Sequence, residues 1–378
     1  MSDVYVVGSD MIKFGRYPLQ TPARLGSKAA LLALKDAGLT IHDVDVFYAA
    51  SAFTAASMLG QQILRQIGQT GIPVINVSNA CASGATAFRE AFVAIKSGLY
   101  QVALAVGAEQ NPRGMIEMPS DFGPPPEGLF GSQSMPSVFA ELGMAHQARY
   151  GTTFEQFAKV AVKNHHHSTR NPKAMYQVET PLEQVMGAEM IAYPNTKLMC
   201  SMNVDGAAAT ILVSEKKARE LGLGRAVRIA GSALASDPYE VRNPTLLDIN
   251  SVTRKAADSA YQMAGMGPEA MDLVELHDCF ATAELLHYEN LGLCNDGEAG
   301  MLIDTGHTDH GGRMPVNVSG GLLSKGHPIG ATGVANICEI VEHLRGEAGA
   351  RQVEGARIGL AHVLGWGTAA AVHILEKA

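Results

Sequence analysis

The sequence predicts an α/β protein made of two similar halves, and three observations support this prediction. Short apolar strands alternate with amphipathic helices along the 378 residues. The strands are rich in small and β-branched residues, which favours a mostly parallel sheet with helices on both faces. The strings Val-Ile-Asn-Val-Ser at 74–78 and Pro-Val-Asn-Val-Ser at 315–319 each precede a glycine-containing turn and a helix. This similarity indicates an internal duplication, and chance similarity of so short a string is the alternative.

The N-terminal half is expected to cover residues 1–225. Apolar residues recur every three or four positions in its helical segments, which are predicted at 23–37, 61–67 and 84–98. Short apolar runs predict its strands, at 4–7, 44–49, 74–77, 102–106 and 208–214.

The stretch at about 111–199 interrupts this alternation. Pro112, Pro119 and the prolines at 124–126 cannot lie in the central strands of a sheet, because proline lacks the ladder N–H. Two helices are predicted farther along, at 136–150 and 154–166. We therefore expect an inserted loop domain that covers the sheet as a lid.

The C-terminal half is expected to cover residues 226–378 and to repeat the order of strand, turn and helix. Its helices are predicted at 249–263, 282–291 and 333–344. Its strands are predicted at 227–230, 273–276, 316–318, 358–361 and 369–375.

The composition excludes several classes of protein. The formal net charge is −8 and no basic run is present, so nucleic acid is not an expected partner. No apolar run approaches the length of a membrane span, and the first residues do not form a secretion signal. The five cysteines lack metal-type spacing. We therefore expect reduced thiols, no bound metal and a cytoplasmic protein.

Cys81 is the first candidate for chemistry. It lies in a polar turn between the strand at 74–77 and the helix at 84–98. Unpaired backbone N–H groups and the helix dipole concentrate at such a junction, and both favour a thiolate. The alternative is a small buried cysteine that packs under the helix.

Two further strand-to-helix turns carry candidate partners for Cys81. His327 lies in the rigid turn Gly-His-Pro-Ile-Gly at 326–330 and is the expected base for a cysteine nucleophile. His277 and Cys279 alternate on one extended stretch and can face the same side, where a thiol can donate and accept protons. A loop histidine and a structural thiol are the alternatives.

Other polar residues are weaker candidates. Adjacent histidines at 165–167 point in different directions on a helix, so they cannot chelate one metal together. His307 and His310 are expected in a polar loop. No glycine-rich dinucleotide loop, phosphate-binding loop or serine-hydrolase elbow is present, so no resident cofactor is expected. The remaining cysteines are expected to be packing residues: Cys200, Cys294 and Cys338.

These residues resemble the motifs of the thiolase superfamily. The stretch at 79–84 (Asn-Ala-Cys-Ala-Ser-Gly) is similar to the thiolase nucleophile motif, and 326–333 to the Gly-His-Pro motif. His-Asp-Cys-Phe at 277–280 replaces the usual Asn-Glu-Ala-Phe and resembles the branch of sterol-carrier-protein-type (SCP2-type) thiolases, as do 164–172 and 205–209. The C-terminal stretch at 361–367 lacks the second cysteine of ordinary thiolases, a role that Cys279 takes in that branch. We expect no appended sterol-carrier domain.

The resemblance implies a five-layered α-β-α-β-α fold and coenzyme A thioesters as substrates. It implies that Cys81 forms an acyl-enzyme, that His327 removes its proton, and that Cys279 moves the second proton. His277 and His327 would bind one thioester oxygen. The backbone N–H of Cys81 and one from the loop that ends at Gly365 would bind the other. Either thiolysis or condensation is implied, in lipid metabolism, by a homodimer or homotetramer. The residues that contact coenzyme A are not implied.

Other functions remain open at this point. One is a C-acyltransferase that acts on a carbon nucleophile other than a coenzyme A thioester, such as a phenolic ring. A retro-aldolase is another, and the intact Cys81 and Cys279 speak against it. A silent subunit of a complex is a third. SCP2-type relatives pair with a zinc-ribbon/OB-fold protein of the DUF35 type, so such a partner is possible for an active chain too.

Overall fold

The computed structural model describes residues 2–114, 134–238 and 249–378, so the prolines at 119 and 124–126 lie outside the described residues. Nine strands form one sheet in the order β3-β2-β4-β7-β1-β8-β11-β10-β9. The strands of the first half are β1 (Val4–Met11), β2 (Val46–Ala50), β3 (Val74–Val77), β4 (Val102–Glu109) and β7 (Gly206–Ser214). Those of the second half are β8 (Val227–Ser236), β9 (Leu273–Glu275), β10 (Ile358–Gly365) and β11 (Ala369–Lys377).

The strand order shows the duplication. Outward from the centre, the first half runs β1-β7-β4-β2-β3 and the second runs β8-β11-β10-β9. Val316 extends the second series by one position, because it forms a parallel bridge with Val274 in β9. This bridge corresponds to the parallel pairing of β3 with β2 in the first half. The two series meet where Tyr5 and Val6 of β1 pair with Arg228 and Val227 of β8.

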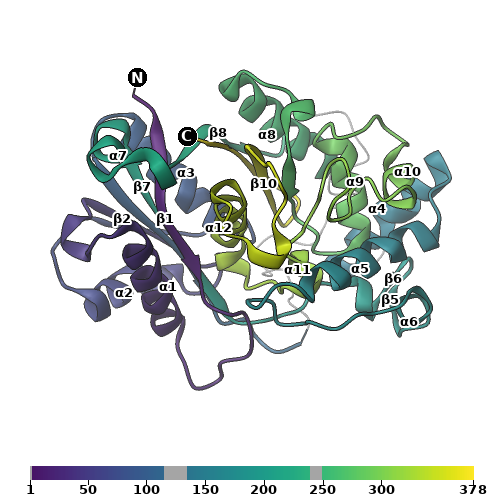
Figure 1. Cartoon of the computed structure of the whole chain (residues 1–378). Helices are drawn as coiled ribbons and strands as arrows, with labels where there is room; N and C mark the ends of the chain where they lie inside the picture. Colours follow the sequence, from purple (N-terminus) through teal and green to yellow (C-terminus); the bar gives the residue numbers. More distant parts are fainter. Residues whose placement is uncertain (1, 115–133, 239–248) are drawn as a thin grey trace.

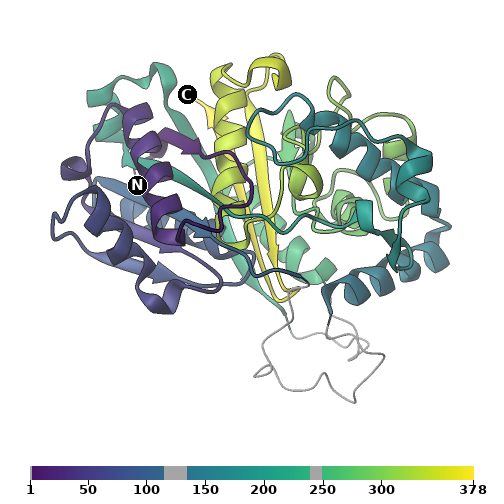
Figure 2. The same ribbon diagram turned by 90° about the horizontal axis from the view of Figure 1, so that it is seen from below.

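Helices form three layers around the two halves of the sheet. Helices α1 (Pro22–Ala37) and α2 (Leu59–Ile67) cover the outer face of the first half, and α8 (Ile249–Ala264) covers that of the second. Between the halves lie α3 (Ser83–Lys96) and α12 (Thr332–Arg345), which contact each other and strands of both series (Figures 1 and 2). One hydrophobic cluster joins side chains from both series with these two helices. The five-layered arrangement is therefore confirmed.

The segment after residue 134 packs against the second half, although it belongs to the first half in sequence. Figures 1 and 2 show it beside the helices of the second half. A single hydrophobic cluster contains its side chains and those of α9 (Ala281–Asn290). The insert comprises α4 (Met135–Tyr150), α5 (Phe154–Ser168), α6 (Leu182–Met186), β5 (Met190–Ala192) and β6 (Asn195–Thr196). The other helices are α7 (Glu215–Leu221), α10 (Ala299–Asp304) and α11 (Gly321–Ser324). The domain boundary at 225/226 stays a prediction.

The expectation of a mostly parallel sheet is wrong. Of the ladders between the nine strands, β2–β3, β2–β4 and β9–β10 are parallel, and the other five are antiparallel. The long insert between β4 and β7 lets β7 return in the opposite direction, and a tight turn joins β10 to β11. Alternation of strands and helices predicts parallel pairs only where one helix connects two neighbouring strands.

The expected strand at 316–318 is only a bridge. Asn317 adopts a left-handed φ of 53°, which ends the ladder after Val316. Its side-chain oxygen instead accepts a hydrogen bond from the backbone N–H of Leu276 at 2.9 Å. A side-chain contact thus replaces a strand pair here.

No helix within the described parts of the chain is long and apolar enough to cross a membrane.

Candidate active site

The turn before α3 holds Cys81 at the start of that helix. Ala80 takes a left-handed φ of 48°, which bends the chain sharply after β3. The Ser83 hydroxyl accepts a hydrogen bond from the backbone N–H of Asn79 (2.8 Å) and donates to the carbonyl of Ala80 (2.6 Å). The small residues on either side of Cys81 allow this close turn, which leaves the thiol buried at the edge of a cavity.

Glycines let the loop of His327 approach the helix of Cys81. A Cβ on Gly84 would lie 2.7 Å from the carbonyl oxygen of Gly330, and one on Gly107 would lie 2.4 Å from it. Gly326 adopts a left-handed φ of 111° directly before His327. The loop therefore reaches from the second half into the first at the point where α3 begins.

The orientation of the His327 ring follows from its neighbours. Its Nδ1 lies 2.7 Å from the Thr332 hydroxyl, which itself donates to the carbonyl of Pro328 at 3.1 Å. The hydroxyl therefore accepts from Nδ1–H, which leaves Nε2 of the neutral ring free to accept a proton. The Asn111 side chain also donates to the carbonyl of His327 at 2.7 Å and fixes the backbone.

The structure brings the four predicted side chains to one cavity. Cys81, His277, Cys279 and His327 all line it. The Cys81 sulfur and the nearest ring nitrogens of the two histidines lie within 4.8 Å of one another. The two imidazole rings meet edge to face, with 5.3 Å between their centroids. The three groups are therefore neighbours, and proton transfer between them requires an approach to hydrogen-bond distance, about 2.6–3.2 Å.

Gly365 lies against the turn of Cys81. A Cβ at this position would be 2.6 Å from the carbonyl oxygen of Asn79 and 3.2 Å from the backbone nitrogen of Ala82. The next residue, Trp366, has a left-handed φ of 46° and lines the cavity. Glycine at 365 therefore allows the end of β10 to touch the nucleophile turn.

Burial, and not the helix terminus, controls the charge state of the site. Burial raises the pKa of Cys81 to about 12, while hydrogen bonds from the backbone of Trp366 and of Cys81 itself act against it. Burial also lowers the pKa of His327 to about 3. The pKa of Cys279 is raised and that of His277 lowered, again mainly by burial. At neutral pH the free site thus holds neutral thiols and neutral imidazoles, contrary to the thiolate expected at Cys81.

The cavity has a volume of about 540 Å³. Its walls are mostly apolar and come mainly from the insert and the second half, with Arg16, Cys81 and residues 201–203 contributed by the rest of the first half. The rings of Phe139 in α4 and Phe280 before α9 stack there, with 5.2 Å between centroids. Arg16 and Lys197 also line it, with side chains that are 41% and 69% exposed, and each is paired with a carboxylate at 3.5 Å, Asp205 and Glu189 respectively.

The other residues considered in the sequence have structural partners. The rings of the three adjacent histidines point in different directions, because each forms hydrogen bonds with different partners. These are Leu198 and Ser324 for His165, Glu179 for His166, and Asn317 for His167. His310 bonds to the backbone of the 351–352 loop. Cys294 and Cys338 lie outside the cavity lining, whereas Cys200, expected to be a packing residue, is part of it.

Sequence reasoning did not assign His165 or Trp366 to the cavity, which both line, and it missed Glu109, which contacts the loop of His327. Glu109 is buried at the end of β4 and accepts hydrogen bonds from Ser51, Ala52 and Gly330. Burial raises its pKa to about 7. Its position in a run of small apolar residues gave no signal. Trp366 was detectable, because a large residue between two glycines indicates a constrained turn.

Two domain families match the chain. The thiolase N-terminal domain matches residues 4–190, and the thiolase C-terminal domain-like family matches residues 235–377. The chain belongs to the thiolase family. The predicted superfamily and the predicted fold are therefore confirmed.

Individual relatives of this thiolase-family chain agree with the motif analysis. Sterol carrier protein 2 of Homo sapiens is 38% identical over 99% of this chain and 72% of its own length. An acetyl-CoA acetyltransferase of Methanothermobacter thermautotrophicus is 39% identical over the whole of both chains. The solved structure of an Ltp2-ChsH2(DUF35) aldolase has a TM-score of 0.87 at 26% identity and covers 99% of this chain and 98% of its own. The SCP2-type branch and the class of acyltransferase are thus confirmed.

Proposed function

We propose that the chain is a thiolase that cleaves 3-ketoacyl-CoA thioesters, or forms them by the reverse condensation, through an acyl group on Cys81. The observation that carries this proposal is the meeting of Cys81, His277, Cys279 and His327 at one cavity. Similarity to an acetyl-CoA acetyltransferase over the whole chain supports it.

In the first half-reaction His327 takes the proton of Cys81 on Nε2, and the sulfur attacks the 3-keto carbon. The bond between carbons 2 and 3 then breaks, and the enolate of the departing acetyl-CoA takes a proton from Cys279. In the second half-reaction Cys279 takes the proton of the incoming coenzyme A thiol. That thiol attacks the acyl group, and His327 returns its proton to Cys81. No resident cofactor takes part in these steps.

Negative charge develops on two substrate oxygens during these steps. His277 and His327, whose rings meet edge to face, would donate to one of them. The backbone N–H of Cys81 and one from the loop that ends at Gly365 would donate to the other. Each such donor contributes about 3–4 kcal/mol to acyl transfer in general.

Coenzyme A thioesters suit the cavity by shape and charge. Its apolar walls match an acyl chain and the pantetheine arm. The exposed side chains of Arg16 and Lys197, which are paired with Asp205 and Glu189 in the free chain, would exchange these partners for the phosphates. We propose that the insert around α4, which supplies Met135 and Phe139 to the wall, covers this arm.

We propose a cytoplasmic homo-oligomer, a dimer or a tetramer. β3 is an edge strand of the sheet, its residues are partly exposed, and Ile75 is 39% exposed. Unpaired edge strands favour pairing with another chain. A DUF35-type partner is a further possibility, supported by the similarity to the thiolase-like chain of the Ltp2-ChsH2(DUF35) aldolase.

A C-acyltransferase on a different carbon nucleophile would use the same acyl-enzyme on Cys81, so only the products distinguish it from a thiolase. An aldolase is the second candidate function, and the TM-score of 0.87 with an aldolase favours it. The two thiols at the cavity favour the thiolase instead, because acyl transfer needs a nucleophile and a separate proton carrier.

The purified chain should consume acetoacetyl-CoA in the presence of coenzyme A, and longer and branched 3-ketoacyl-CoAs should be compared with it. Incubation with acetyl-CoA alone should place an acetyl group on the peptide that contains Cys81, as detected by mass spectrometry. Acetylation only at other residues, or none with any acyl-CoA, would exclude Cys81 as the nucleophile. Labelling of Cys81 without thiolysis would favour the C-acyltransferase.

Replacement of Gly365 should disturb acylation without unfolding the chain. Gly365→Ala places a methyl group 2.6 Å from the Asn79 carbonyl, so the nucleophile turn and the loop must separate. We expect a fall of about tenfold to a hundredfold in the acylation rate, as misplaced donors cost in other acyl-transfer sites. Gly224→Ala is the matched control, because a Cβ there meets no atom within 4 Å. Equal acylation rates in the two variants would contradict a role for Gly365.

A further inference from the structure

A buried ion pair joins the two segments that carry the histidines of the site. Glu275 is the last residue of β9 and lies two positions before His277. Lys325 directly follows α11 and lies two positions before His327. The Glu275 carboxylate and the Lys325 ammonium are 3.6 Å apart, and each side chain is 1% exposed. The pair therefore links the two segments at points that each lie two residues before a histidine of the site.

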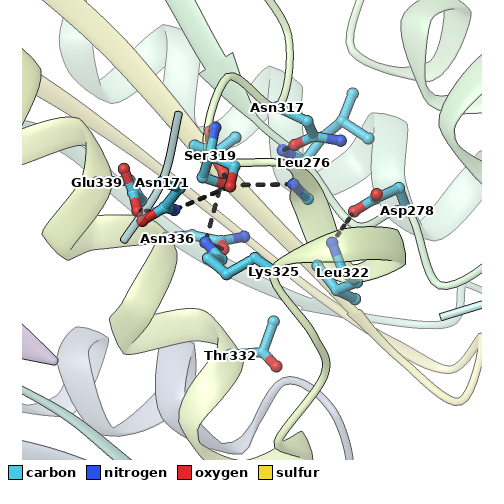
Figure 3. A network of polar contacts seen from close by, with 12 residues as sticks. Asn171, Leu276, Asp278, Asn317, Ser319, Leu322, Lys325, Thr332, Asn336 and Glu339 are labelled. Carbon is cyan, nitrogen blue, oxygen red and sulfur yellow. Dashed lines mark hydrogen bonds and ion pairs between the residues drawn. The ribbon is translucent and has the colours of Figure 1, made fainter. Parts of the chain in front are cut away.

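Further polar contacts tie this ion pair to its surroundings (Figure 3). The Glu275 carboxylate accepts hydrogen bonds from the backbone N–H of Ser319 (3.0 Å) and from its hydroxyl (2.5 Å). The Lys325 ammonium lies 3.5 Å from the side-chain oxygen of Asn336, in the second turn of α12. The ion pair thus contacts the elements before and after His327.

Asp278 makes a second connection between the same segments. Its carboxylate accepts a hydrogen bond from the backbone N–H of Leu322 at 2.7 Å (Figure 3) and another from that of Leu323 at 3.2 Å, both in α11. A Cβ on Gly321 would lie 2.0 Å from this carboxylate, so glycine is needed for the contact. His277 is therefore held between two acidic residues, both of which are anchored to the segment that leads to His327.

The His277 ring has no comparable anchor of its own. Its Nδ1 is buried and has no hydrogen-bond partner among the described residues. Its backbone N–H lies 3.4 Å from Nδ1 of His362. The separation of 5.3 Å between the rings of His277 and His327 therefore depends on the backbone on either side of each histidine.

A buried ion pair adds little net stability, because the cost of desolvation offsets the attraction between the charges. Removal of one partner is harmful, because an unpaired charge stays buried. Replacement of both partners by neutral groups of similar size removes this penalty and also removes the geometric constraint. Stability and positioning at this pair can therefore be measured separately.

We propose that the Glu275–Lys325 ion pair is a positioning device that sets the separation of His277 and His327, and with it their shared contact to the substrate oxygen. The proposal rests on the proposed function in one respect, namely that the two rings act on one oxygen. Neither Glu275 nor Lys325 lines the cavity, so both act through the histidines.

The test compares Glu275→Gln, Lys325→Met and the double variant with the unchanged chain. Each single variant should unfold at a lower temperature and lose about a hundredfold in kcat, since small misplacements of reacting groups cost this much. The double variant should regain most of the unfolding temperature but not kcat, with KM for acetoacetyl-CoA nearly unchanged. Its crystal structure should show a changed separation between the two rings.

Arg345→Met is the matched control. It breaks the largely buried ion pair with Asp36, at the opposite end of α12 from His327. It should lower the unfolding temperature and leave kcat unchanged. A double variant with normal kcat and unchanged ring separation would overturn the proposal, as would an equal loss of kcat in Arg345→Met. If the single variants do not fold, kcat and the ring separation of the double variant alone test the proposal. Absence of turnover in the unchanged chain would contradict the proposed function, while the ring separation would still test the ion pair.

Discussion

Cys279→Ala should still acquire an acyl group on Cys81 but lose most of its thiolysis and condensation. Cys279 lines the same cavity as Cys81. Among the described residues, Cys200 is the one further cysteine in the cavity lining. General acid–base catalysis contributes about a hundred- to ten-thousand-fold, and we expect a loss in this range. The loss should appear in kcat more than in KM, because the thiol acts on a proton that moves in the transition state.

The half-reactions can be followed separately. Single-turnover labelling with acetyl-CoA measures acylation of Cys81, and release of coenzyme A products measures the full cycle. Cys279→Ser should also be impaired, since a hydroxyl is a much weaker acid than a thiol. Cys294→Ala is the control, because that thiol lies outside the cavity lining. Near-normal turnover in Cys279→Ala would move the proton-carrying role to His277 or His362.

His327→Ala should lower the rate at which Cys81 reacts, and turnover should fall by about the same factor as that rate. Nε2 of the neutral His327 ring is the free acceptor near the thiol, and the thiol has a pKa of about 12. Without this base, alkylation of Cys81 by iodoacetamide at neutral pH should slow. In the unchanged chain the alkylation rate should keep rising with pH through the alkaline range, because ionisation of the thiol is incomplete below pH 12.

The comparison needs a histidine that is remote from the cavity. His42→Ala serves, because His42 is exposed and does not line the cavity. Alkylation and turnover should be normal in this variant. If His327→Ala folds and alkylates at the same rate as His42→Ala, another group removes the proton of Cys81.

Local patterns in the sequence were sufficient to predict most helices and strands. Apolar residues such as Phe88 and Phe92 are spaced to face the core between the halves, and α3 follows that spacing. Strand directions were not predictable, because they depend on how the chain returns after the 111–199 insert. The position of that insert on the second half was also not predictable, since it depends on contacts between side chains far apart in sequence, such as Phe139 and Phe280.

The positions of the site residues were predicted better than their charges. The junction between a strand and a helix marked Cys81, and a turn with two glycines marked His327, because glycine permits close approach of the backbone. The neutral state of these groups could not be predicted, because it depends on burial in the folded chain. Glu109 and the Glu275–Lys325 pair were missed for the same reason. A single acidic or basic residue at the end of an apolar strand or beside a glycine is not distinguishable in sequence from a surface charge.

The raised pKa of Cys81 has a consequence for the lifetime of the protein. Peroxides and disulfides attack thiolates far faster than thiols, so susceptibility to oxidation follows thiolate character and exposure. Cys81 is 7% exposed and neutral in the free chain. We therefore expect the same burial that makes the nucleophile depend on His327 to slow the oxidation of Cys81 while no substrate is bound.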